Sequence, residues 1–129
     1  MSGHLYTLEE AQALLPQART KVTEAAALVA DLQRLLMQLR AGTAPASTVD
    51  QAAMLESAVD ATFAWFEQHG VQIKSLTPAL LDFPARAIRD GEPIEVLLCW
   101  RDDEDAIAYY HPPEGGYAVR EPVALLDRV

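Results

Sequence analysis

The spacing of apolar residues changes its period once along the chain. In the first half, apolar residues recur at alternating steps of four and three, at Ala18, Val22, Ala25, Val29, Leu32, Leu36 and Leu39. This heptad spacing is typical of a helix that packs along a partner helix in coiled-coil fashion. A second set follows at Ala52, Leu55, Val59, Thr62 and Phe66. Two matched seams predict a long antiparallel helical hairpin.

The residues before the first seam predict a separate short helix. Thr7-Leu8-Glu9-Glu10 has the form of a capping box, in which a hydroxyl and a carboxylate satisfy two free amides at a helix start. Proline disfavours helical geometry in the residue before it, so this helix should stop near Leu15. Pro16 suits the first turn of the next helix, where no amide hydrogen is needed. We therefore expect a helix boundary at Leu15–Pro16.

The hairpin has clear limits. Gly42 and Pro45 interrupt the helical pattern, so residues 41–47 are expected to form the loop. Thr48 can cap the second helix, and Gly70 can end it in a left-handed conformation. Such a hairpin would leave four large apolar side chains exposed, and a third layer or a second copy would have to cover them: Leu35, Met54, Phe63 and Trp65.

After Gly70 the pattern becomes that of strands. We expect strands near 71–74, 80–84, 94–101 and 106–111, with a short addition at 117–120. Pro84 is expected at a strand end or edge. The predicted fold class is α+β, with a short helix, a long hairpin and a small antiparallel sheet of about four strands. We assign residues 1–129 to a single domain, with a helical part at 1–70 and a sheet part at 71–129.

Composition narrows the class of protein. The 129 residues include 10 basic and 19 acidic ones, giving a net charge of −9 that repels nucleic acid. No apolar run approaches the ~20 residues of a membrane span. A single cysteine excludes an internal disulfide and favours a reducing compartment. We expect an acidic cytoplasmic protein that binds neither nucleic acid nor membrane.

Four ordered motifs carry a resemblance to a known family. They are Tyr6–Ala11 with Leu14-Leu15-Pro16, then Leu81–Arg86, then Val96–Arg101, and finally His111. Together they resemble a family of small uncharacterised prokaryotic proteins catalogued as a domain of unknown function (twenty-two-oh-three). The resemblance covers nearly the whole chain and implies one compact domain. It implies no activity and no catalytic residue.

Residue types suited to chemistry gather on two predicted neighbouring strands, 96–101 and 107–111. A four-residue turn at 102–105 would place Cys99 opposite Ala108, and side chains along a strand alternate between faces. Cys99 and His111 would then lie on opposite faces. We therefore expect no catalytic pair, no metal site and no cofactor, and we favour a protein without enzymatic activity.

The same register predicts a second sheet face that is too apolar for water. Its members are Leu97, Cys99, Ala108 and Tyr110. Either the N-terminal helix or a second subunit should cover this face, since exposed apolar patches usually mark interfaces. The function we favour is a protein-interaction or oligomerisation module, with a homodimer or another protein as its partner.

A small-ligand site is the alternative hypothesis. It would bind an anion, as binding protein or enzyme, through Asp82, Arg86, Arg101, His111 and Arg120. The planar guanidinium group suits carboxylate and phosphate. This hypothesis requires the five side chains to converge in one pocket. Otherwise Asp82 and Arg86 form an ion pair, and His111 is a half-buried side chain bonded to the backbone.

Overall fold

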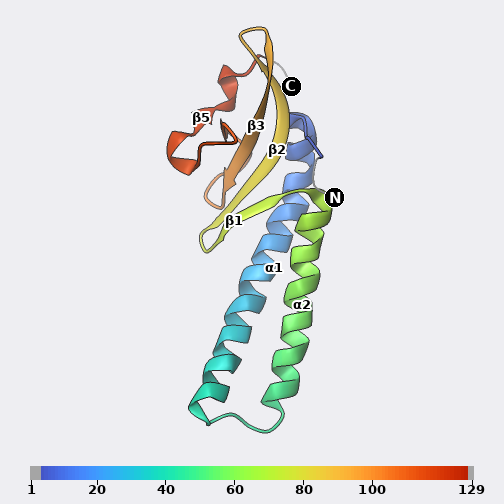
Figure 1. The fold of residues 1–129 in the computed structure, drawn as a ribbon, viewed down its shortest axis with the longest axis vertical. Helices are drawn as coiled ribbons and strands as arrows, with labels where there is room; N and C mark the ends of the chain where they lie inside the picture. Colours follow the sequence, from blue (N-terminus) through green and yellow to red (C-terminus); the bar gives the residue numbers. More distant parts are fainter. Residues whose placement is uncertain (1–3, 128–129) are drawn as a thin grey trace.

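The computed structural model describes residues 4–127 and has an α+β fold, as the sequence predicts (Figure 1). Two helices form an antiparallel hairpin, α1 (Leu8–Ala41) and α2 (Thr48–His69). The strands follow them in one sheet: β1 (Gln72–Leu76), β2 (Ala79–Arg89), β3 (Glu92–Arg101), β4 (Tyr109–His111) and β5 (Glu121–Pro122). Their order in the sheet is β1-β2-β3-β4-β5, and each neighbouring pair is antiparallel.

The predicted helix boundary at Pro16 is wrong, because α1 continues through this proline. The capping box at Thr7 is formed as expected, with Glu10 N donating to Thr7 Oγ1 at 3.1 Å and Thr7 N donating to Glu10 Oε1 at 2.9 Å. Ala11, Leu15 and Ala18 are buried on both sides of Pro16, which itself is exposed. Packing of this continuous apolar stripe outweighs the roughly 3 kcal/mol that an interior proline costs.

The hairpin seam is present, but it rotates along α1. Val22 and Ala25 are buried, whereas further along Leu35 is buried and Leu36 is 43% exposed. A helix with 3.6 residues per turn drifts against a strict 3.5-residue repeat, so the contact stripe moves to the next residue. In α2 the seam is buried at Ala52, Val59, Thr62 and Phe66.

The ends of α2 match the prediction only in part. Gly70 ends the helix with a φ of 69°, in the left-handed region as expected. The residue before the helix is Ser47 rather than Thr48, and its side chain forms no capping hydrogen bond. Thr48 is buried as the first residue of the helix. The first turn of α2 therefore lacks the side-chain cap that we expected there.

Strand β2 is longer than predicted and contains Pro84 in its interior, not at its end. Strand β1 pairs only with residues 79–82, and beyond it Tyr6 takes over the edge of β2. Tyr6 N donates to Pro84 O at 2.8 Å, and Arg86 N donates to Tyr6 O at 3.0 Å. Because Pro84 directs its carbonyl to this outer edge, its missing amide hydrogen removes no bond to β3. The Asp90-Gly91 turn joins β2 to β3 with positive φ at both residues.

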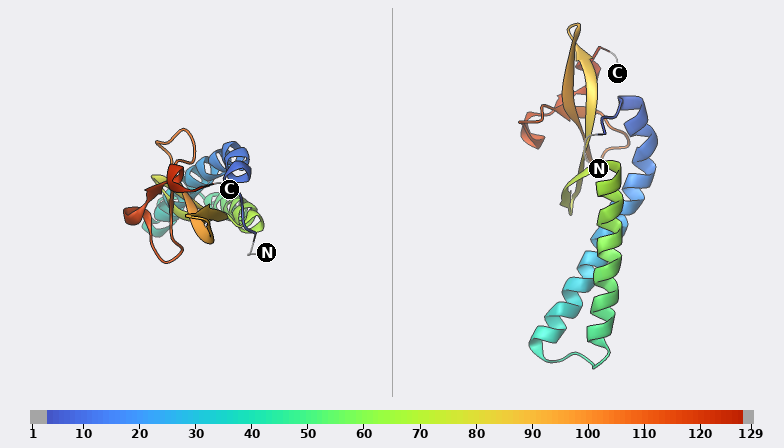
Figure 2. Two further views of the ribbon diagram at one scale, coloured as in Figure 1. Left: turned by 90° about the horizontal axis from the view of Figure 1, so that it is seen from above. Right: turned by 45° about the vertical axis from the view of Figure 1, so that its right-hand side comes forward.

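Both faces of the sheet are covered, by different parts of the chain. The helices cover one face, and the segment 112–120, which leads into β5, lies over the other (Figure 2). The core between helices and sheet includes Leu81, Phe83, Leu98 and Trp100 together with Leu15 of α1. The opposite face therefore lies under the chain's own C-terminal segment and not under the N-terminal helix, which was one of the two covers we considered.

Candidate functional site

The register between β3 and β4 differs by one residue from the predicted one. Leu97 pairs with His111, and Cys99 pairs with Tyr109 instead of Ala108. The connection before β4 is longer than a four-residue turn, since Ile107 is held by Gln12 of α1 through two hydrogen bonds of 2.8 and 2.9 Å. A shift of one residue moves every side chain to the other face. The prediction that Cys99 and His111 lie on opposite faces is therefore wrong.

The observed register gathers three reactive side chains from three adjacent strands. Asp82 of β2 pairs with Cys99 of β3, and His111 of β4 lies diagonally beyond Cys99 on the same face. All three are buried, with 1%, 0% and 2% of their surfaces exposed, respectively. One potential ligand atom of each lies within 4.8 Å of the other two. We call this set the Asp-Cys-His cluster.

Hydrogen bonds fix the orientation of the histidine in this cluster. His111 Nδ1 lies 2.9 Å from the carbonyl oxygen of Pro112, and a carbonyl only accepts, so this nitrogen carries a hydrogen. The other nitrogen, Nε2, lies 3.0 Å from Asp82 Oδ2. A buried Asp–His pair sharing a proton satisfies both of these atoms. The second carboxylate oxygen, Asp82 Oδ1, is buried and has no hydrogen-bond partner in the part of the chain that the structure describes.

The cysteine of the cluster is held as a neutral thiol. Burial raises the pKa of Cys99 to about 12, and the nearby charge of Asp82 adds to the effect. Both nitrogens of His111 are occupied by other groups, so neither serves as a base for the thiol. A nucleophilic cysteine needs a lowered pKa and an adjacent base. The arrangement therefore differs from that of a cysteine hydrolase.

Arg120 holds the C-terminal segment against the sheet face that carries Cys99. Its guanidinium group lies 4.2 Å from the ring centre of Tyr109 and 4.5 Å from that of Tyr117. It donates to the backbone oxygen of Cys99 at 3.2 Å and forms an ion pair with Glu104 at 2.6 Å. These contacts leave little of the guanidinium group free for a ligand.

The residues of the predicted anion site are only partly brought together. Asp82 pairs with His111, not with Arg86. Arg101 contacts Asp103 at 3.8 Å. Arg86 lines a different depression, beside His4, Thr7 and Glu10. Of the five predicted residues, then, Asp82 and His111 are in direct contact, Arg120 reaches the backbone of Cys99, and Arg86 lies apart.

The predicted interface residues also separate. Leu97 and Cys99 are buried on the face beneath the C-terminal segment. Tyr110 lies on the opposite face within the core, where its hydroxyl bonds to Arg89. Ala108 is exposed in the connection before β4. These four residues therefore do not form one surface.

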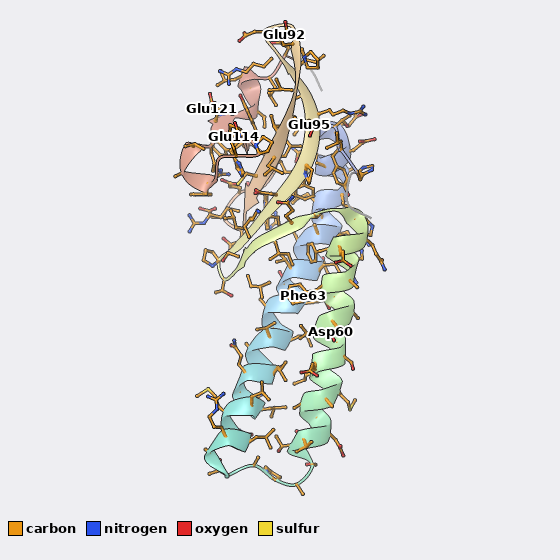
Figure 3. All side chains as sticks on the ribbon, viewed as in Figure 1. Asp60, Phe63, Glu92, Glu95, Glu114 and Glu121 are labelled. Atoms are coloured by element: carbon orange, nitrogen blue, oxygen red, sulfur yellow. The ribbon has the colours of Figure 1, made fainter. Side chains whose placement is uncertain are left out.

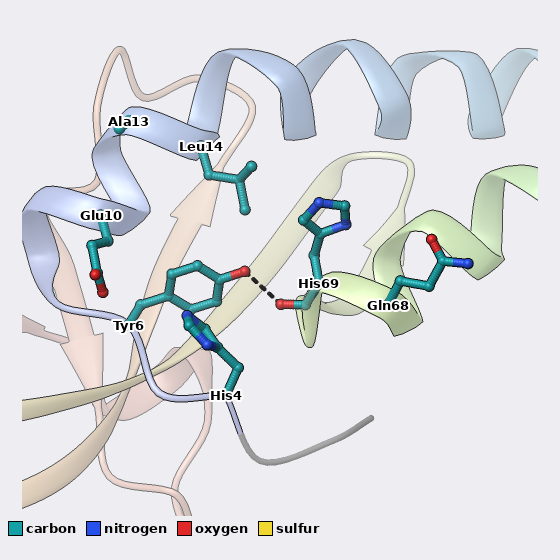
Figure 4. A pocket seen from close by; sticks show the side chains of 7 residues that line it. All are labelled: His4, Tyr6, Glu10, Ala13, Leu14, Gln68 and His69. Carbon is teal, nitrogen blue, oxygen red and sulfur yellow. Dashed lines mark hydrogen bonds between the residues drawn. The ribbon is translucent and has the colours of Figure 1, made fainter.

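A pocket of about 520 Å³ lies between the start of α1 and the end of α2, lined by His4, Tyr6, Glu10 and His69 among others (Figure 4). Three of its polar residues, Tyr6, Glu10 and His69, form hydrogen bonds within the chain. Tyr6 donates to the backbone oxygen of His69, and the His69 ring bonds to the backbone oxygen of Trp65 at 2.8 Å. The Glu10 carboxylate accepts from the amide of Thr7. This pocket offers a ligand mainly apolar contacts.

Comparison with known proteins gives a family and no further assignment. No helix within residues 4–127 is both long and apolar enough to cross a membrane. No curated protein and no solved structure matches the chain. The model of a family described as an uncharacterized conserved protein, DUF2203, matches residues 4–123. This match spans nearly all of the chain and agrees with the motifs noted above, so the protein belongs to the DUF2203 family.

Proposed function

We propose that this protein is a non-enzymatic, cytoplasmic interaction module that forms a homodimer through the distal half of its helical hairpin, residues 26–64. One observation carries the proposal. Large apolar side chains are exposed on both helices in this region, namely Leu36, Met37, Val49 and Met54, at 43%, 66%, 60% and 73%. Where exposed apolar side chains form a continuous patch, the patch usually marks a protein interface.

The distal half of the hairpin lacks a third layer. The sheet packs against the start of α1 and the end of α2, and the rest of the hairpin extends beyond it (Figure 1). Between Ala25 and Leu35 no residue of α1 is buried. Because the seam drifts around α1, Leu36 faces outward. This part of the heptad stripe is therefore free to pack against a helix of another chain. A second hairpin would complete a four-helix, coiled-coil-like bundle.

The distribution of charge favours a second copy at this end. Residues 26–64 contain two of the ten basic and four of the nineteen acidic residues, so this half of the hairpin carries −2 of the total −9. The sheet end carries Glu92, Glu95, Glu114 and Glu121 (Figure 3). Two acidic chains repel each other least where their charge is lowest. A twofold contact between hairpins keeps the acidic ends apart.

The alternative, a small-anion site, has less support. Arg120 is engaged by Glu104 and two tyrosines, and Arg101 by Asp103 and Tyr117. Their positive charges are largely balanced within the chain. No contact of these residues favours an anion over the carboxylates already present.

Size-exclusion chromatography with light scattering tests the dimer. At micromolar concentration the full chain is expected to have twice the mass of the 14.1 kDa protomer. The double variant Met37→Glu/Met54→Glu, which changes two exposed helix positions, is expected to be monomeric with an unchanged circular dichroism spectrum. Leu125→Glu, at an apolar residue 46% exposed at the sheet end, is the matched control and should remain dimeric. A monomeric wild-type chain would overturn the proposal.

A further inference from the structure

We propose that Asp82, Cys99 and His111 bind one divalent cation of the zinc class. The three residue types supply a carboxylate oxygen, a thiolate sulfur and an imidazole nitrogen, the donor types that zinc takes in proteins. Three adjacent strands of one sheet hold them, so the backbone fixes their spacing. All three residues of the Asp-Cys-His cluster are buried.

The spacing of the donor atoms suits a small tetrahedral ion. All three lie within 4.8 Å of one another, and Asp82 Oδ2 and His111 Nε2 are 3.0 Å apart. At ordinary zinc bond lengths, ligand atoms at tetrahedral angles are separated by roughly 3.3–3.8 Å. Small side-chain rotations therefore bring the cluster into a coordinating arrangement. The strands need not move.

The orientation of His111 is that of a metal ligand. Its Nδ1–H donates to the carbonyl oxygen of Pro112, which directs Nε2 toward the cluster. Metal-binding histidines almost always donate their second nitrogen to a carbonyl or carboxylate in this way. The cluster therefore has the supporting hydrogen bond that such a site requires.

The unsatisfied oxygen of Asp82 is an independent sign of a missing partner. Asp82 Oδ1 is buried without a hydrogen bond to any residue among 4–127, which normally costs free energy. A cation bound by the carboxylate would satisfy it. Charge is balanced as well, since a divalent ion offsets one carboxylate and one thiolate and leaves a neutral site. A neutral site is the state best suited to burial.

Binding moves protons in a defined way. Without metal, the thiol of Cys99 keeps its proton, and a further proton lies between Asp82 and His111 Nε2. When the ion binds, both protons leave to solvent, while Nδ1 of His111 keeps its hydrogen. Cysteine and histidine select zinc, cobalt and related ions over magnesium and calcium, which prefer oxygen donors.

Cobalt(II) titration of the untagged full chain, reduced and freed of metal, tests the site. The wild-type protein is expected to develop a thiolate-to-cobalt absorption band that saturates at one equivalent and disappears when zinc is added. Cys99→Ser should lose the band. His111→Asn should bind cobalt at least about 100-fold more weakly, because a coordinating group is lost outright. The matched control is His69→Asn, at a histidine outside the cluster, and it should keep the band.

A second measurement on the wild-type chain alone guards against variants that fail to fold. Zinc is expected to raise its melting temperature in proportion to the logarithm of the zinc concentration, and magnesium is not. A wild-type chain that gives no cobalt band and no zinc-dependent melting shift would overturn the proposal. So would a Cys99→Ser variant that binds cobalt as tightly as the wild type.

Discussion

The centres of the two sheet faces are equally buried, but one centre is apolar and the other is polar. Toward the helices, β2 and β3 place Phe83 and Leu98, which are fully buried and apolar. On the other face, the neighbouring residues Asp82 and Cys99 are buried to the same degree. The apolar face needs volume and shape, whereas the polar face needs a partner for each donor and acceptor. Truncation of a central residue should therefore be costly on either face, but for a different physical reason on each.

The largest expected effects come from truncating one residue on each face. Phe83→Ala should lower the free energy of unfolding by about 3–5 kcal/mol, because it leaves a cavity. Asp82→Ala should cost about the same, because His111 loses the partner of its buried ring nitrogen. Urea unfolding of metal-free protein measures both. If Asp82→Ala costs less than about 1 kcal/mol, the polar face does not depend on its hydrogen bonds and the comparison fails.

A smaller effect is expected at the one polar link between α1 and the strand connection. The side-chain amide of Gln12 bonds to both the backbone N–H and the C=O of Ile107. Gln12→Ala should lower the free energy of unfolding by about 1–3 kcal/mol, because two backbone groups lose their partners. The exposed Gln17, on the same helix, provides the control, and Gln17→Ala should change stability by no more than about 0.5 kcal/mol. Equal effects of the two substitutions would contradict the assigned role of Gln12.

The last effect is absent at neutral pH, where the thiol is neutral in both states, and it involves Cys99 alone. Its pKa in the fold is about 12, raised from 9.0, so the folded state favours the neutral thiol. The corresponding stability is fully present below pH 9 and is lost as pH rises toward 12. In metal-free protein, stability should fall by about 1.4 kcal/mol per pH unit in this range relative to Cys99→Ala. If the free energy of unfolding depends on pH in the same way in both proteins, burial does not raise the pKa of the thiol and the prediction is wrong.

The hairpin was predictable because its signal repeats many times. The first seam supplies seven apolar residues at helical spacing and the second supplies four together with Thr62, so an error at one position does not change the result. Pro16 was misjudged because a local rule about proline cannot weigh the buried residues on both sides of it. Tertiary packing decides that case.

The strands of the sheet could be predicted from the sequence, but the register between β3 and β4 could not. The position of β4 depends on Gln12, ninety-five residues earlier in the chain, which holds Ile107 and lengthens the connection. No local pattern carries that information, and one residue of slip reverses the faces. The Asp-Cys-His cluster was missed for this reason. The available signal was that three of the motifs that carry the family resemblance each contain one of its members, Asp82, Cys99 and His111.

The outer edge of β2 has a consequence for solubility. Beyond β1, this edge is closed by Tyr6, which bonds to Pro84 and Arg86, and by Asp127, whose amide donates to Ile88 O. An open strand edge is a template on which other chains add strands and aggregate. A shortened chain that stops after Leu126 would expose part of that template while the buried residues of the core stayed in place. Such truncated chains should be lost from solution by self-association rather than by unfolding.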